Sequence, residues 1–238
     1  MFTAERCNSL MKTINKVLLI VLVAIPFGFQ GTCLADESLG AILEGIRKTY
    51  GPLPGLSVPY TREVVTRSMT MLGGQIKGDL ASGAIYFKHP HFLRLDQERP
   101  RPETIIANGE TLWWVIPGKN CAYRYPADQF GKELRLLSDI FRGLAHVADS
   151  FEVVLNQENV SGKYEIELIP NPPWEEIERI RVIGGQDYQI HSIDIFNALG
   201  TITRFTLGTL SEKGDFKEGF FRFVPPEGMD VIVEGADQ

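Results

Sequence analysis

The chain of 238 residues has little cysteine, no cluster of positive charge and only one long apolar run. Its three cysteines, Cys7, Cys33 and Cys121, do not have the spacing of a zinc or redox motif. Lys and Arg never form a run, and the net charge is −6. The sequence therefore argues against nucleic-acid binding, which depends on phosphate neutralisation, and against strong surface docking on anionic lipids.

The single long apolar run, Val17–Phe29, is too short to span a bilayer comfortably. It follows Lys12 and Lys16 and ends shortly before Ala35. A basic start, an apolar middle and a small-residue cleavage site are typical of a secretory signal peptide. We therefore predict a signal peptide at residues 1–35, one domain at residues 36–238, and a periplasmic location.

Two alternatives concern the leader. Met11 stands just ahead of Lys12 and can be the true start. Cys33 raises the question of a lipidated cysteine, although the residues before it, Gln30–Thr32, fit a lipoprotein cleavage motif poorly. After cleavage, 21 basic and 29 acidic residues remain, which gives a net charge of −8. Cys121 is then the only cysteine, so the domain must fold without an internal disulfide.

Residues with catalytic or metal-binding chemistry are sparse. His89-Pro90-His91 supplies two imidazoles, but no Cys or carboxylate cluster lies nearby at ligand spacing. The acidic stretch Glu175–Glu178 follows a proline turn and is typical of a solvated surface. No nucleophile elbow, phosphate loop or dinucleotide motif is present. The sequence predicts a binding protein with no metal and no cofactor, and not an enzyme.

The pattern of apolar residues predicts a mainly β protein with an α-helical lid. Ser38–Tyr50 has helical spacing, and many short strands separated by Gly and Pro turns follow, the last at Gly219–Val224. One amphipathic helix interrupts them within Ala127–Ala148, with Phe130, Leu134, Leu137 and Phe141 on one stripe. This order favours a single large curved antiparallel sheet, or incomplete β-barrel, with the helix lying on the sheet.

Five stretches resemble segments of the LolA family of lipoprotein carriers, in the family's order and over nearly all of residues 36–238. Tyr60–Val64 is similar to the family's Phe-Thr-Gln-x-Val strand, and Gly83–Asp96 to its Lys-Arg-Pro segment. Asn108–Pro117 is similar to the Asp-Gly-Lys-x-Leu-Trp hairpin, and Ile193–Thr203 to a late hairpin. Phe221–Val231 is similar to the Phe-x-Phe-x-Pro-Pro-x-Gly-Val-Asp ending.

This resemblance implies a hydrophobic cavity covered by helices, which binds the acyl chains of lipoproteins released from the inner membrane and carries them to the outer membrane. It also implies an inner-membrane ABC transporter and an outer-membrane receptor as partners, with the carrier as a monomer. Trp113-Trp114 places one indole on each face of its strand. The residues expected to line the cavity are Ile85, Phe87, Leu93, Leu95, Trp113, Phe130, Leu134, Leu137 and Phe141.

The chain departs from the family pattern at several positions. His89 stands where the family has an Arg that is thought to hold the lid shut, and Leu93 and Leu95 replace Phe and Trp. Tyr60 replaces the opening Phe, and Arg62 the Gln. Because imidazole titrates near pH 6.5, we hypothesise that His89 is the lid latch and makes lid closure depend on pH.

Three other functions stay open at this point. The fold can carry a different lipid, such as a glycolipid, and leucines in place of aromatics allow this. It can also act as an envelope-stress module that senses lipoproteins, although such proteins usually have further domains or an anchor. An enzyme would need a set of catalytic residues that the sequence does not offer.

Overall fold

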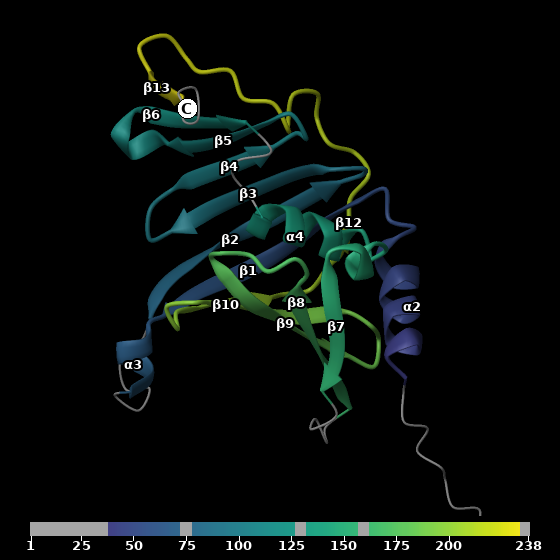
Figure 1. Ribbon diagram of the computed structural model, residues 1–238. Coiled ribbons are helices and arrows are strands. Elements are labelled where there is room, and N and C mark those ends of the chain that lie inside the picture. Colours follow the sequence, from purple (N-terminus) through teal and green to yellow (C-terminus); the bar gives the residue numbers. More distant parts are fainter. Residues whose placement is uncertain (1–37, 72–77, 127–131, 157–161, 234–238) are drawn as a thin grey trace, which may run out of the picture. The chain divides into compact units, whose positions relative to one another are not determined.

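The computed structural model describes residues 38–71, 78–126, 132–156 and 162–233 (Figure 1). The predicted signal peptide and Phe130 lie outside these residues. Leu134 lies in a described helix, but its side chain is outside the description. The strands are β1 (Gly55–Val65), β2 (Asp79–Lys88), β3 (Phe92–Arg99), β4 (Glu103–Ala107), β5 (Thr111–Ile116), β6 (Cys121–Pro126), β7 (Phe151–Asn156), β8 (Lys163–Pro170), β9 (Ile177–Gly185), β10 (Ile190–Asn197), β11 (Ile202–Leu207), β12 (Ser211–Glu212) and β13 (Asp230–Val233).

These strands form one large curved sheet, which confirms the predicted fold class. Along the sheet the strands follow the order β13-β6-β5-β4-β3-β2-β1-β11-β10-β9-β8-β7, and β12 pairs with β1. Neighbouring strands are antiparallel except β13, which runs parallel to β6. Figure 1 shows the sheet bending so that its two halves face each other, with α4 between them. We call the face toward α4 the inner face and the opposite face the outer face.

Alternation of apolar and polar side chains accounts for the inner face. In β8, Tyr164, Ile166 and Leu168 are buried, while the side chains between them are less buried. Successive residues of a strand point to opposite faces, so every second residue enters the core. The core cluster draws on β1–β3 and β7–β11 together with helices α2 and α4.

Helix α2 (Leu39–Tyr50) begins where Ser38 accepts a hydrogen bond from the backbone N–H of Ala41. Its buried stripe includes Ile42 and Ile46. The hydroxyl of Tyr50 accepts a hydrogen bond of 2.9 Å from the backbone N–H of Ile190, which ties the helix to β10. The stripe and the Tyr50 contact together fix α2 against the sheet.

Within the described residues, the predicted amphipathic helix ends before its apolar pattern does. Helix α4 spans Lys132–Phe141, and the 3-10 helix η2 follows at Val147–Asp149. Between them, Gly143 has φ +80° and Leu144 has φ +54°. Left-handed backbone conformations end an α-helix, and glycine adopts them without steric cost. The α-helix therefore ends just before Gly143.

The predicted strand at Gly219–Val224 is wrong. These residues form a turn and an extended segment, and the last strand is β13 at the sheet edge. Phe220 contacts Tyr86, Phe221 contacts Phe92, and Phe223 contacts Trp113 through ring edges or tilted rings. The three phenylalanines therefore hold this segment against other aromatic rings, and the segment does not pair as a strand.

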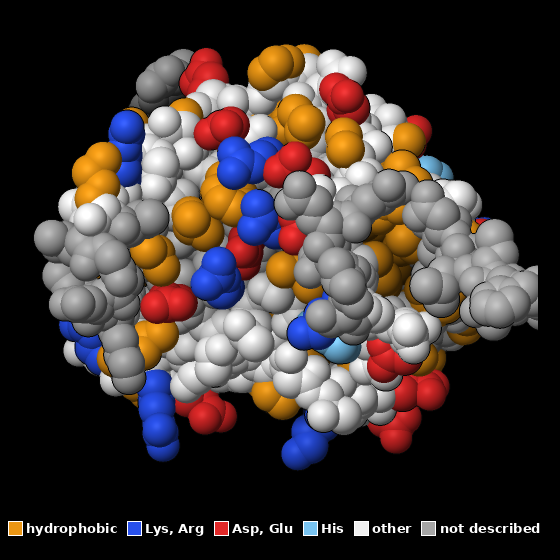
Figure 2. Space-filling model, turned by 90° about the horizontal axis from the view of Figure 1, so that it is seen from below, with side chains coloured by type: hydrophobic (Ala, Val, Ile, Leu, Met, Phe, Trp, Pro, Cys, Tyr) orange, Lys and Arg blue, Asp and Glu red, His pale blue; other side chains and the backbone are white. Residues whose placement is uncertain are grey.

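The outer face of β8–β11 carries ion pairs between neighbouring strands. Glu167 lies 2.7 Å from Arg179, and Asp194 lies 2.9 Å from Arg204. The view from below in Figure 2 shows acidic and basic side chains interspersed, without a patch of one sign. Asp194 is 1% exposed and accepts two hydrogen bonds from Arg204 and one from Ser192. Pairing of this kind offsets the cost of burying a carboxylate.

We predict that Asp194→Asn lowers the free energy of unfolding by about 2 kcal/mol, because it removes the acceptor charge from two charge-assisted hydrogen bonds. The cost stays below that of a fully buried pair because the Arg204 side chain is 43% exposed. Urea denaturation of the purified protein measures the change. Glu152→Gln, an exposed strand carboxylate, is the matched control and should shift stability by less than about 0.5 kcal/mol. Equal effects of the two variants would contradict this account.

Candidate functional site

The inner face of β1–β5 has two apolar rows, defined by strand register. The first apolar row is Leu56, Phe87, Leu93, Ala107 and Leu112. The second apolar row is Val58, Ile85, Leu95, Ile105 and Trp114. Because paired residues of neighbouring strands share a face, each row is a continuous stripe across five strands. Leu56, Val58, Ile85, Phe87, Leu93 and Leu95 are all 5% exposed or less.

Helix α4 and the residues after it cover this inner face. Four apolar side chains from α4, Leu136, Leu137, Ile140 and Phe141, are 1% exposed or less. The Phe141 ring lies 6.1 Å from Phe87 and 6.4 Å from Tyr50, measured between ring centroids. The helix therefore packs on the first apolar row and on α2 at once. Such a helix conceals an apolar surface that would otherwise face water.

The structure brings together six of the residues that the sequence singled out for a cavity. Four lie in the two apolar rows, and two lie on the face of α4 that packs over them. They are Ile85, Phe87, Leu93, Leu95, Leu137 and Phe141. Helical spacing indicated Leu137 and Phe141, and the resemblance to the family implied the set as a cavity lining; that these residues bind a ligand stays a prediction.

Trp113 was predicted to line the cavity, but the structure places it on the outer face. It pairs with Ile106 and Arg124, and its ring lies 5.3 Å from Phe223 on the outer face. The adjacent Trp114 takes the inner position, and its indole N–H donates a hydrogen bond of 3.0 Å to Glu103. The two adjacent indoles offered no sequence signal for choosing between faces. Only the register with β4 decides it.

His89, the predicted latch, lies where the β2–β3 turn meets the end of the α4 segment. Its ring is 5.1 Å from Phe87, and its Nε2 is buried with no hydrogen-bond partner among the described residues. Burial, and then the positive charge of Arg142, lower the pKa of His89. Among the described residues, the imidazole makes no hydrogen bond through Nε2 that would hold a lid shut. It is nevertheless a titratable group at the edge of the lid.

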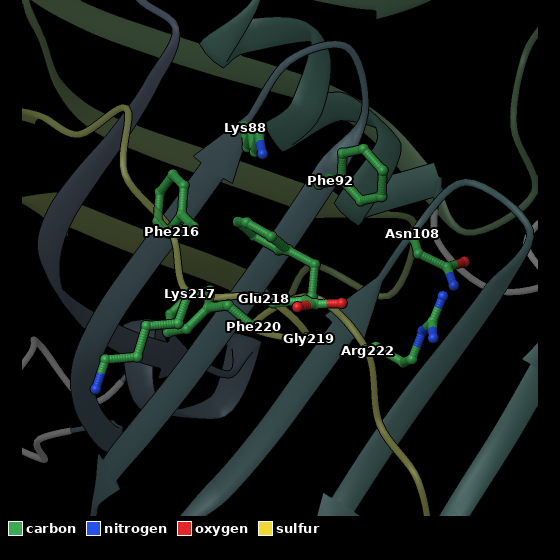
Figure 3. A pocket seen from close by; sticks show the side chains of 10 residues that line it. Lys88, Phe92, Asn108, Phe216, Lys217, Glu218, Gly219, Phe220 and Arg222 are labelled. Carbon is green, nitrogen blue, oxygen red and sulfur yellow. The ribbon is translucent and has the colours of Figure 1, made fainter.

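A separate cavity of about 500 Å³ lies on the outer face beneath residues 213–224, which we call the C-terminal segment (Figure 3). Phe92, Phe216, Phe220 and Phe221 contribute aromatic walls. Charged and polar side chains line the rest, and Figure 3 shows the Asn108 amide and the Arg222 guanidinium pointing toward one another. Methylene groups placed here would lie beside Lys217, Glu218 and Arg222, so this cavity does not suit a long acyl chain.

The C-terminal segment is held to the sheet by contacts between two cationic side chains and aromatic rings. Arg94 donates a hydrogen bond of 2.9 Å to the backbone carbonyl of Phe220 and lies 4.6 Å from the centre of its ring. Lys213 lies 5.2 Å from the ring centre of Tyr86. These cation–π contacts fix the chain across β2 and β3.

Within the described ranges, no three His, Cys, Asp or Glu side chains gather closely enough to hold a metal ion. In the same part of the chain, no helix is long and apolar enough to cross a membrane.

Comparison with known proteins gives consistent results. The family model "Outer membrane lipoprotein carrier protein LolA" matches residues 73–224. An outer-membrane lipoprotein carrier protein of Alkalilimnicola ehrlichii is 26% identical over 221 residues, which is 92% of this chain and 96% of that protein. The carrier of Neisseria meningitidis serogroup B is 22% identical, over 87% of this chain and 96% of that protein.

One solved structure supports the fold. An uncharacterised conserved protein from Thermus thermophilus superposes with a TM-score of 0.52 at 8% identity, and covers 82% of this chain and 98% of that one. The family match covers well over half of the chain and agrees with the curved sheet and the covering helices. The chain therefore belongs to the LolA family of outer membrane lipoprotein carrier proteins.

Proposed function

We propose that this protein is a periplasmic, non-enzymatic carrier that binds the acyl chains of lipoproteins released from the inner membrane and delivers them to the outer membrane. The observation that carries the proposal is the pair of apolar rows beneath α4. On leaving its place, the helix would expose an apolar surface that extends across five strands. An inner-membrane ABC transporter and an outer-membrane receptor are the partners that the family membership suggests.

The free energies of burial favour replacement of the lid side chains by acyl chains on the inner face. Burying the four inward side chains of α4 contributes roughly 6–12 kcal/mol, at about 1.5–3 kcal/mol for each. A lipoprotein with about 45 acyl methylenes gains up to roughly 35 kcal/mol at about 0.8 kcal/mol each, which is an upper bound. Relative to water, acyl chains can therefore gain more from burial than the lid side chains do, while the closed lid keeps the empty protein from exposing its apolar rows.

The proposal is tested by expressing the full chain, purifying the protein from the periplasm and adding it to spheroplasts that make labelled lipoproteins. A soluble one-to-one complex with lipoprotein is the expected result. If no lipoprotein is released, and mass spectrometry of the purified protein finds another lipid, the cargo would be that lipid and the lipoprotein assignment would fail. The mass of the purified chain also tests cleavage after Ala35.

We predict that Leu93→Glu abolishes formation of the lipoprotein complex, because it places a carboxylate in the first apolar row. Leu80→Glu is the matched control, since it makes the same substitution at an exposed position of β2 on the outer face. It should keep most of the wild-type yield. If Leu93→Glu does not fold by circular dichroism, Ile105→Glu at a half-buried position of the second apolar row replaces it. Complex formation by both inner-face variants would refute the site.

We further predict that acyl-chain uptake increases as the pH falls from 8 to 5.5. The pKa of His89 is lowered in the closed state by burial and by Arg142, which itself pairs with Asp139. At pH 8 the imidazole is neutral whether the lid is open or closed. As the pH falls below 6.5, the open state takes up the proton first, and the closed state loses relative stability.

A fluorescent fatty-acid methyl ester measures this effect without a titrating headgroup. The wild type should bind it about threefold more tightly at pH 5.5 than at pH 8. His89→Ala should show no such difference, and His91→Ala, on the exposed side of the same turn, should behave as wild type. Equal affinity at both pH values in wild type and His89→Ala alike would rule out a pH-sensitive lid.

A further inference from the structure

The inner face becomes polar beyond the two apolar rows. Two residues further along the strands, the third row consists of Tyr60, Gly83, Gln97 and Glu103. Beyond it, Arg62 is paired across the strands with Ala81 and Phe205. An acyl chain lying over the apolar rows would therefore end beside polar side chains. This end of the inner face is where a headgroup would lie.

Two polar groups in this region are buried without a hydrogen-bond partner among the described residues. They are the hydroxyl of Tyr60, whose side chain is 2% exposed, and the Nε of Arg62. A buried polar group left unpaired costs about 1–3 kcal/mol, and folded proteins tolerate few of them. Two neighbours of this kind on one strand point to a group that is bound there in the working protein.

The surroundings leave these two groups available to a ligand. The Tyr60 ring packs on Phe205 at 5.9 Å, which directs it along the inner face. Glu103, the acid in the same row, accepts the indole N–H of Trp114. No ion pair of Arg62 is present in the part of the chain that the structure describes. Ala81, the β2 partner of Arg62, has only a methyl side chain, and Gly83, the partner of Tyr60, lies against the backbone of Asp96 in β3.

The chemistry of the pair fits one negative charge. Arg presents several N–H donors in a fixed plane that matches a carboxylate or phosphate. Burial raises the pKa of Tyr60 to about 12, so its hydroxyl stays protonated and can donate a hydrogen bond to the same anion. Asp96 and Glu103, whose negative charges act on Tyr60, would oppose any bound anion, so the positive charge of Arg62 limits the site to one negative charge.

We propose that Arg62 and Tyr60 bind the anionic group, carboxylate or phosphate, of an amphiphile whose acyl chain lies over the apolar rows. The inference rests on the proposed function, because it requires acyl chains to occupy the inner face. It adds amphiphiles with an anionic group as a class of ligand. Ester- and amide-linked acyl chains carry no charge and leave the pair unused. The same cavity therefore distinguishes acidic lipids from neutral ones.

The test compares matched probes on the purified, delipidated protein at pH 8, where His89 is neutral. The probes are a fluorescent fatty acid, its methyl ester, the monoacyl phosphate of the same chain, and inorganic phosphate as a competitor. The wild type should bind the acid and the monoacyl phosphate about tenfold more tightly than the ester. Arg62→Gln should remove this preference and leave ester binding unchanged. Arg62→Lys should keep part of it, and Tyr60→Phe should weaken acid binding about threefold.

Arg99→Gln, an exposed arginine of β3, is the control and should behave as wild type. Equal affinity of the wild type for acid and ester, or an equal loss of both in Arg62→Gln, would overturn the proposal. Competition by inorganic phosphate alone as strong as by the acyl phosphate would overturn the lipid assignment. Release of lipoprotein without any preference for acid probes would leave the proposed function standing and refute this site. Preferential binding of acid probes without release of lipoprotein would support this site and refute the proposed function.

Discussion

Contact between helix α4 and the apolar rows of the inner face is the interaction on which the rest of the structure depends. Four side chains of α4 are almost fully buried there, and Phe141 also reaches Tyr50 of α2. Without this cover, the curved sheet would expose a broad apolar surface to water, which soluble proteins rarely do. The sheet cannot bury this surface by closing into a barrel while β7 and β13 remain at opposite ends of the strand order. The helix therefore completes a core that the sheet leaves open.

The same contact explains how a stable fold can also be a carrier. The lid competes with acyl chains for one surface, so stability of the empty protein and affinity for cargo oppose each other. The outer face stabilises the sheet and does not bind cargo in this account. Its ion pairs and the aromatic contacts of the C-terminal segment keep the sheet in shape whether or not the lid is in place. Changes on the inner face should therefore affect cargo more than folding, and changes on the outer face the reverse.

Much of this arrangement could be predicted from the sequence, because period-two and helical patterns follow directly from backbone geometry. Helical spacing placed Leu137 and Phe141 on one stripe, and both lie in the core together with Leu93 and Leu95, which the family resemblance indicated. The choice between Trp113 and Trp114 could not be made, since two adjacent indoles fit either face until the register with β4 is known.

Other features depend on contacts between residues far apart in the chain. The phenylalanines after Gly219 have the alternation of a strand, but aromatic packing against Tyr86, Phe92 and Trp113 determines their conformation. The sequence marked Tyr60 and Arg62 as departures from the family pattern. That the hydroxyl of Tyr60 and the Nε of Arg62 are both buried without a hydrogen-bond partner among the described residues is visible only in three dimensions.

The central claim is that cargo lies on the inner face, and adjacent Trp113 and Trp114 allow a matched test. A photo-crosslinking amino acid is placed at one position or the other, and each protein is incubated with spheroplasts that make labelled lipoproteins. The account predicts a crosslink to lipoprotein from position 114 on the inner face and none from position 113, which faces Phe223. A crosslink from position 113, or an equal yield from both, would contradict it.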